Sequence, residues 1–178
     1  QLTVTFLASW IARKGIDTLV TAANILQEKG LHLNWLLAGT GATREVVLSR
    51  WPEELHAAVE VISKFPRGSE ESILARSNIF VLPSYFEGQP LSLLQAMAAG
   101  RCCITTDCCG QRDLIQHGYN GLLYKPGDAQ QFAALIEECV NNEEVRMSLG
   151  RNAKASVKDR GWETVSSELV DHIEAVLG

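Results

Sequence analysis

Short apolar runs alternate with amphipathic segments along most of this chain. Six of the runs have the length and composition of buried strands. They cover residues 2–8, 32–38, 59–62, 79–82, 102–106 and 121–124. Between them, apolar residues recur at helical spacing. Strands that alternate with helices favour a parallel sheet covered on both faces. We therefore expect an α/β domain with a Rossmann-like three-layer α/β/α fold and a parallel sheet of about six strands.

From residue 128 onward the pattern becomes purely helical. It predicts helices over residues 129–140, from 142 to about 159, and over 162–177. Asp128 has the residue type and position of an N-cap. No repeat, low-complexity segment or linker divides the sequence, so we expect a single domain over residues 1–178.

The composition is typical of an ordinary globular protein, with 46% hydrophobic and 21% charged residues. The net charge of −5 argues against a general affinity for nucleic acid. No apolar run approaches the roughly 20 residues needed to span a bilayer. No leader with a cleavage site is visible either. We therefore expect a cytoplasmic protein without a membrane span.

The cysteines are odd in number, which favours a reducing compartment. They are Cys102, Cys103, Cys108, Cys109 and Cys139. Two adjacent pairs suggest a metal site, but their spacing does not match the usual zinc patterns. Neighbouring thiols on a strand also point to opposite faces. Small buried apolar residues are the better interpretation, and we expect no metal.

The stretch at residues 83–100, PSYFEGQPLSLLQAMAAG, joins the fourth predicted strand to a helix. Pro83 stops strand pairing because proline has no N–H group. Gly88 and Pro90 mark a tight turn, and Gly100 ends the helix. The helix start faces a loop that bears a carboxylate, and the free N–H groups of such a helix start favour an anion such as phosphate.

This stretch resembles the donor-binding signature of family 4 (group 1) glycosyltransferases, which have the GT-B fold. That signature reads approximately Pro-Ser-x-x-Glu-Gly-Phe-Pro-x-x-x-x-Glu-Ala-Met-Ala-x-Gly. Glu87 matches its first glutamate, Gln95 replaces the second, and Gln89 replaces the usual aromatic residue. The resemblance covers nearly the whole chain from about residue 6. It implies that the chain is the C-terminal, nucleotide-sugar-binding domain of such an enzyme.

The resemblance also implies roles for the residues of this loop. Glu87 would accept hydrogen bonds from the hydroxyls of the donor sugar. The segment that would hold sugar or phosphate oxygens through its backbone consists of Gly88, Gln89, Pro90 and Leu91.

Gln95 stands where the family binds the ribose hydroxyls. Its carbonyl can still accept a hydrogen bond, but it lacks the negative charge that strengthens such bonds. We therefore expect weaker or altered nucleotide binding. A helix residue without ligand contact is the alternative.

The first predicted loop resembles the family segment Gly-Arg-x-x-x-x-Lys-Gly. Lys14 and the glycine after it match, and the resemblance makes Lys14 the candidate cation for the donor diphosphate. A solvated lysine is the alternative. Ser9 occupies the arginine position and is a candidate donor contact. Arg13 is a weak substitute for the missing guanidinium, because its position on the turn predicts that it points elsewhere. Together with Lys14, Glu87 is a candidate catalytic residue.

Two further loops resemble donor-binding segments of the family. Gly39 and Gly41 follow the second strand, where glycine permits close backbone approach to a ligand. Arg44 at the sixth position excludes the dinucleotide fingerprint. Phe65 and Arg67 lie where the family holds the nucleobase, and either could stack on it. For the first of these loops the alternative is a tight turn without ligand contact, and for the second it is an ordinary strand-to-helix connection.

The implied reaction is hexosyl transfer from a nucleoside diphosphate sugar, with UDP or GDP, to an acceptor hydroxyl with retention. No separate cofactor is expected. The partner would be an N-terminal acceptor-binding domain, toward which the helix from residue 162 would pack. Through that domain the protein would associate peripherally with the cytoplasmic membrane. The 178 residues alone would bind nucleotide without transferring sugar. The alternatives are a degenerate, non-catalytic nucleotide-sugar-binding module and a GT-B-type sugar-nucleotide epimerase.

Overall fold

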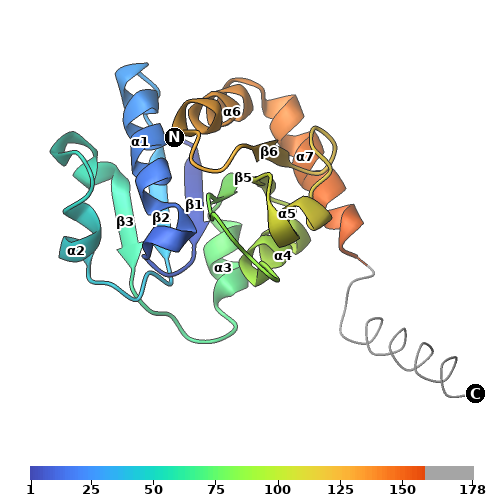
Figure 1. Cartoon of the computed structure of the whole chain (residues 1–178), viewed down its shortest axis with the longest axis horizontal. Coiled ribbons are helices and arrows are strands. Elements are labelled where there is room, and N and C mark those ends of the chain that lie inside the picture. Colours follow the sequence, from blue (N-terminus) through green and yellow to red (C-terminus); the bar gives the residue numbers. More distant parts are fainter. Residues whose placement is uncertain (159–178) are drawn as a thin grey trace, which may run out of the picture.

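The computed structural model describes residues 1–158 (Figure 1). The helix predicted over residues 162–177, and its packing toward another domain, lie outside the described residues.

A six-stranded sheet forms the centre of the structure, in the order β3-β2-β1-β4-β5-β6. Every pair of neighbouring strands is parallel. The strands are β1 (Thr3–Leu7), β2 (Asn34–Ala38), β3 (Val59–Ile62), β4 (Ile79–Leu82), β5 (Cys102–Thr106) and β6 (Leu122–Tyr124). All six fall inside the runs predicted from the sequence, and the expected α/β fold is confirmed.

Helices follow the strands and close the two faces of the sheet (Figure 1). They are α1 (Ile16–Glu28), α2 (Arg44–Leu48), α3 (Glu70–Ala75), α4 (Leu91–Ala98), α5 (Cys109–Leu114), α6 (Ala129–Asn141) and α7 (Glu143–Ser156). Residues 1–158 also contain two 3-10 turns, η1 (Ala12–Lys14) and η2 (Glu53–Ala58). The predicted cap is confirmed, because the Asp128 side chain accepts a hydrogen bond from the Gln131 N–H group.

The apolar core has two parts, one on each face of the sheet. Successive side chains of a strand point to opposite faces, so a continuously apolar strand feeds both parts. In β4, Ile79 and Val81 belong to the part beneath α1 and α6, whereas Phe80 and Leu82 belong to the part beneath α3 and α4. All four side chains are fully buried.

The strand order reverses at the centre of the sheet. The chain moves outward from β1 to β2 and β3, and then returns to place β4 on the other side of β1. The helices that follow β1 and β4 therefore cover opposite faces of the sheet, and the loops that lead into them meet at its carboxyl edge. Open α/β sheets bind their ligands at such a switch point, beyond the carboxyl ends of the strands.

Candidate functional site

The loops that follow β1 and β4 pack backbone against backbone at the switch point. The Tyr85 N–H group donates to the Arg13 carbonyl over 2.9 Å. Gly15 has a φ of +71°, and a Cβ atom there would lie 1.9 Å from the Pro83 carbonyl oxygen. A glycine is therefore required at this position for both its backbone conformation and its contact. The contact fixes the preceding residues of the first loop against the central loop.

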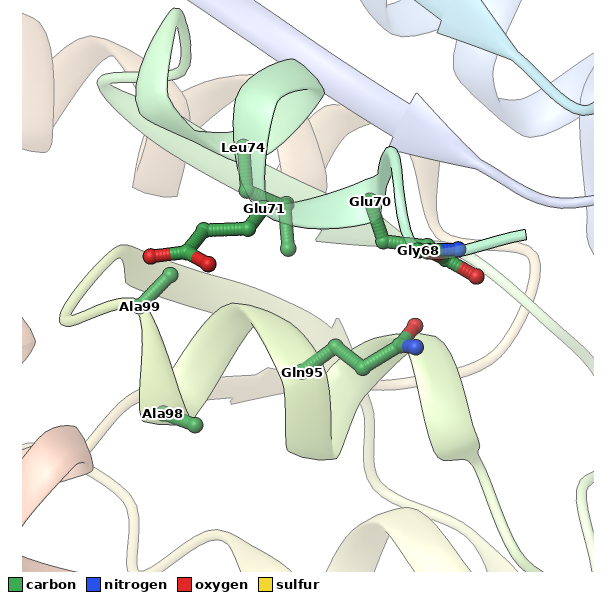
Figure 2. A pocket seen from close by; sticks show the side chains of 7 residues that line it. All are labelled: Gly68, Glu70, Glu71, Leu74, Gln95, Ala98 and Ala99. Carbon is green, nitrogen blue, oxygen red and sulfur yellow. The ribbon is translucent and has the colours of Figure 1, made fainter. Parts of the chain in front are cut away.

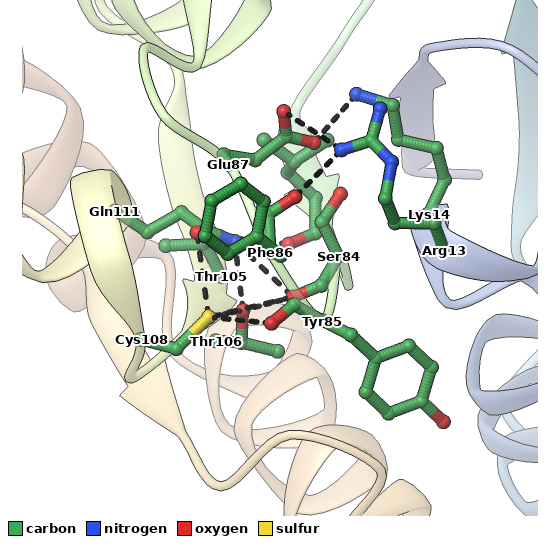
Figure 3. A network of polar contacts seen from close by, with 11 residues as sticks. Arg13, Lys14, Ser84, Tyr85, Phe86, Glu87, Thr105, Thr106, Cys108 and Gln111 are labelled. Atoms are coloured by element: carbon green, nitrogen blue, oxygen red, sulfur yellow. Dashed lines mark hydrogen bonds and ion pairs between the residues drawn. The ribbon is translucent and has the colours of Figure 1, made fainter.

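This packing brings the two candidate catalytic residues together. Lys14 Nζ lies 2.5 Å from Glu87 Oε1, and their side chains are only 16% and 9% exposed (Figure 3). Arg13 Nη1 lies 3.7 Å from Glu87 Oε2 and donates to the Phe86 carbonyl over 2.7 Å. The sequence-based expectation that Arg13 points elsewhere is wrong. The tight turn of η1, closed by Gly15 in the left-handed conformation, directs Arg13 and Lys14 to the same loop.

The loop after β5 supports the central loop from its other side. The Gly110 N–H group donates to the Glu87 carbonyl over 3.0 Å. A Cβ atom on Gly110 would lie 2.2 Å from the Gly88 carbonyl oxygen, so a larger residue would displace this loop. Gly110 thus holds the backbone of Glu87 in place.

A buried polar network beneath the central loop was not predicted from the sequence. Thr106 Oγ1 donates to the Ser84 carbonyl over 2.5 Å, and Gln111 Nε2 donates to Thr106 Oγ1 over 2.7 Å (Figure 3). Burial raises the pKa of the nearby Cys108 thiol. The available signal was a polar residue, Thr106, at the end of an apolar strand. This network fixes the base of the loop that bears Glu87.

The start of α4 continues the same loop. Gly88, Gln89 and Leu91 are exposed there, and Pro90 is buried immediately before the helix. The Leu91 and Leu93 N–H groups at this end donate to the Gln89 and Pro90 carbonyls, and the positive end of the helix dipole favours an anion here. The backbone segment predicted to hold sugar or phosphate oxygens is thus accessible at the carboxyl edge of the sheet.

Gln95 lies on the side of α4 that faces α3, where the two helices border a pocket of about 340 Å³ (Figure 2). The lining residues are Gly68, Glu70, Glu71, Leu74, Gln95, Ala98 and Ala99. Glu70 turns one carboxylate oxygen toward its own loop, where it accepts from the Gly68 N–H group over 2.7 Å. The pocket combines the Gln95 amide with two carboxylates from α3, a set that suits hydroxyl donors.

The remaining candidates are distributed around the same edge. Gly39 and Gly41 lie in the turn after β2 and have left-handed φ angles of +68° and +66°. A Cβ atom on Gly39 would lie 3.2 Å from the Phe65 ring, so the structure brings these two loops together. Arg67 and Ser9 are exposed. No cluster of three or more His, Cys, Asp or Glu side chains within residues 1–158 is placed to hold a metal ion.

The chain matches the family described as glycosyl transferases group 1 over residues 1–156. An uncharacterized glycosyltransferase of Methanocaldococcus jannaschii is 27% identical over 158 residues, which make up 89% of this chain and 44% of that protein. A second relative, the N,N'-diacetylbacillosaminyl-diphospho-undecaprenol alpha-1,3-N-acetylgalactosaminyltransferase of Campylobacter jejuni, is 30% identical over 84% of this chain and 38% of its own length. The chain thus spans less than half of these relatives.

Solved structures of low sequence identity share the fold. The sucrose-phosphate synthase of Thermosynechococcus elongatus superposes with a TM-score of 0.87 at 22% identity, over 99% of this chain and 46% of that one. Anabaena HepE, solved with UDP and glucose, gives 0.82 at 18% identity, over 98% and 48%. The C-terminal domain of a group 1 glycosyl transferase, LpcC of Francisella tularensis, gives 0.74 at 20% identity, over 88% and 84%. Among the helices of residues 1–158, none is long and apolar enough to cross a membrane.

Proposed function

This chain belongs to the group 1 glycosyltransferase family, and we propose that the carboxyl edge of its sheet binds the nucleoside diphosphate sugar that serves as donor. In the whole protein the sugar passes to an acceptor hydroxyl. The family match and the GT-B glycosyltransferases among its structural neighbours support sugar transfer as the reaction class.

The observation that carries this proposal is the pairing of Lys14 with Glu87 beside the start of α4. A cation and a helix N-terminus together favour the charge of a diphosphate. The carboxylate next to them is an acceptor for sugar hydroxyls. A nucleoside diphosphate sugar carries both features side by side, because its negative charge lies on the phosphates and its hydroxyl groups lie on the adjoining sugar.

The chemistry follows from the same arrangement. When the bond between the sugar and the diphosphate breaks, negative charge builds up on the departing phosphate oxygen. Lys14 and the positive end of the α4 dipole stabilise that charge in a preorganised site. Glu87 orients the sugar through its hydroxyls. The proposal includes retention at the anomeric carbon, a hexose as the sugar, and no metal ion for donor binding.

We propose that the nucleoside occupies the pocket beside Gln95. Its volume of about 340 Å³ is bordered by the Gln95 amide and by Glu70 and Glu71. Ribose hydroxyls would donate to these oxygens. Phe65 lies near the Gly39 turn at the adjacent loop and is available to pack on the base. The base itself is proposed to be uracil or guanine, and the UDP bound by Anabaena HepE makes UDP the first ligand to test.

The acceptor site is proposed to lie on a second domain of the whole protein. The relatives are more than twice as long as the matched segment, which leaves room for one. The 178 residues are therefore expected to bind donor but not to transfer sugar. Cytoplasmic location, with peripheral membrane association through the other domain, is part of the same proposal.

A degenerate binding module is the second candidate. Three candidate donor-contact positions differ from the family pattern, namely Ser9 in the first loop and Gln89 and Gln95 in the donor-binding signature. If the site has lost its donor affinity, Ser9→Arg combined with Gln95→Glu restores it by a large factor. If the site is functional as it stands, the wild-type chain already binds and the double variant changes affinity little.

A calorimetric titration with UDP, GDP, ADP and NAD tests the main proposal. We expect one nucleoside diphosphate to bind, and Lys14→Ala to weaken it about tenfold or more, the effect of losing one charged contact. Lys29→Ala is the matched control, because Lys29 also pairs with a glutamate, Glu137, but at the far end of α1. Equal effects of the two substitutions would contradict the assignment of Lys14.

A further inference from the structure

The family segment that Ser9 to Gly15 resembles pairs an arginine with the lysine, and this chain has serine at the arginine position. It nevertheless keeps a guanidinium in the same loop, on Arg13. Building on the donor site proposed above, we propose that Arg13 is the second cation for the donor diphosphate and replaces the guanidinium missing at Ser9.

Two contacts fix Arg13 against the central loop. Its carbonyl accepts from the Tyr85 N–H group over 2.9 Å, and its Nη1 donates to the Phe86 carbonyl over 2.7 Å. The first contact holds the backbone, and the second directs the guanidinium over the loop that bears Glu87 (Figure 3). The position of the charge is therefore set by the fold before any ligand arrives, which lowers the entropic cost of binding.

Most N–H groups of the Arg13 guanidinium have no hydrogen-bond partner within residues 1–158. It carries five N–H groups in a planar fork. Within residues 1–158 it makes one hydrogen bond, to Phe86, and a longer contact of 3.7 Å with Glu87. Its side chain is 49% exposed, compared with 16% for Lys14. The outer edge of the fork therefore faces solvent, and phosphate oxygens match its geometry.

The charges at the site favour the same assignment. Lys14 and Arg13 are two cations, and Glu87 is the carboxylate that faces both. Lys14 Nζ lies against Glu87 and is largely neutralised by it. The excess positive charge thus resides on Arg13, and a diphosphate that reaches the start of α4 meets a cation that is not already paired at short distance.

The test compares UDP with UMP, and GDP with GMP, by calorimetry on the wild-type chain and Arg13→Ala. A contact with the diphosphate predicts that Arg13→Ala weakens the diphosphate about 10- to 100-fold and the monophosphate much less. Arg76→Ala is the control. Arg76 is 51% exposed and pairs with Glu60, and it lies just before β4 at the amino edge of the sheet. It should leave both affinities unchanged.

A relocated charge separates binding from a structural role. Adding Ser9→Arg to Arg13→Ala should recover most of the lost diphosphate affinity, because the guanidinium returns to the position that the family uses. Equal weakening of diphosphate and monophosphate, with no recovery, would mean that Arg13 only holds the loop and would overturn the inference. Normal diphosphate binding by Arg13→Ala would also overturn it while leaving the proposed function standing. Failure of the wild-type chain to bind any nucleotide would overturn both.

Discussion

Replacing Glu87 by glutamine separates the two functions proposed for the site. The Glu87 carboxylate is proposed to strengthen binding of the sugar, but its negative charge repels the phosphates. Glu87 Oε1 lies 2.5 Å from Lys14 Nζ, so it competes with any phosphate for that cation. A phosphate charge about 6 Å from the carboxylate, at an effective dielectric constant of about 20, is repelled by roughly 3 kcal/mol. Solvent and salt reduce this to about 1–2 kcal/mol.

We therefore expect Glu87→Gln to bind the free nucleoside diphosphate about 5- to 30-fold more tightly than the wild-type chain. The same variant should lose the additional affinity that an attached sugar provides, because neutral hydrogen bonds to the sugar hydroxyls are weaker than charged ones. Calorimetry with UDP and UDP-glucose, or the guanine equivalents, measures both effects. Glu60→Gln, which removes a carboxylate near the amino edge of β3, is the matched control.

Unchanged or weaker diphosphate binding by Glu87→Gln would refute this reasoning, provided that the variant is folded. Far-UV circular dichroism and the midpoint of urea denaturation establish that it is. Such a result would mean that the phosphates do not approach Lys14 and Glu87, and that the ion pair serves only to join the first and central loops.

Two further predictions concern stability. Gly15→Ala should lower the free energy of unfolding by about 3 kcal/mol or more, because its Cβ would lie 1.9 Å from the Pro83 carbonyl. Gly41 has a similar φ of +66° but lies in open space, so Gly41→Ala should cost only about 1–2 kcal/mol of left-handed strain. Urea denaturation measures both differences. Equal costs would contradict the contact. The hydrogen bond from Arg76 lowers the pKa of Glu60 below 4.5. This half-exposed pair therefore stabilises the fold by up to about 1 kcal/mol above that pH. The contribution is lost as the pH falls through the lowered pKa. Glu60→Gln should therefore differ from the wild-type chain at neutral pH and match it in acid; a difference that persists in acid would contradict this.

The sheet was predictable because its strands are buried on both faces and read as continuous apolar runs. Val81 and Leu82 illustrate this, since they are adjacent and fully buried in opposite parts of the core. Once the strands are known to be parallel, the loops after them must share one edge. Lys14 and Glu87 could therefore be expected at one edge of the sheet although 73 positions separate them.

The direction of individual side chains was not predictable in the same way. Arg13 was expected to point away from the site, and the structure shows it on the central loop. The difference arises from a 3-10 turn and from the left-handed backbone of Gly15, which packs closely against Pro83. The network under the loop was missed for a related reason, because the partners of Thr106 are fixed only by the packing of β5 against β4.

The most direct test of the donor site is a site-resolved titration of the isotopically labelled chain with UDP and GDP, followed by amide chemical shifts in ¹H–¹⁵N spectra. We expect saturable shifts concentrated in residues 9–15, 39–41 and 87–95, the loops at the carboxyl edge of the sheet, with α6 and α7 unaffected. Shifts centred on other parts of the molecule, or no shifts at millimolar nucleotide, would contradict the claim that this edge holds the nucleoside diphosphate.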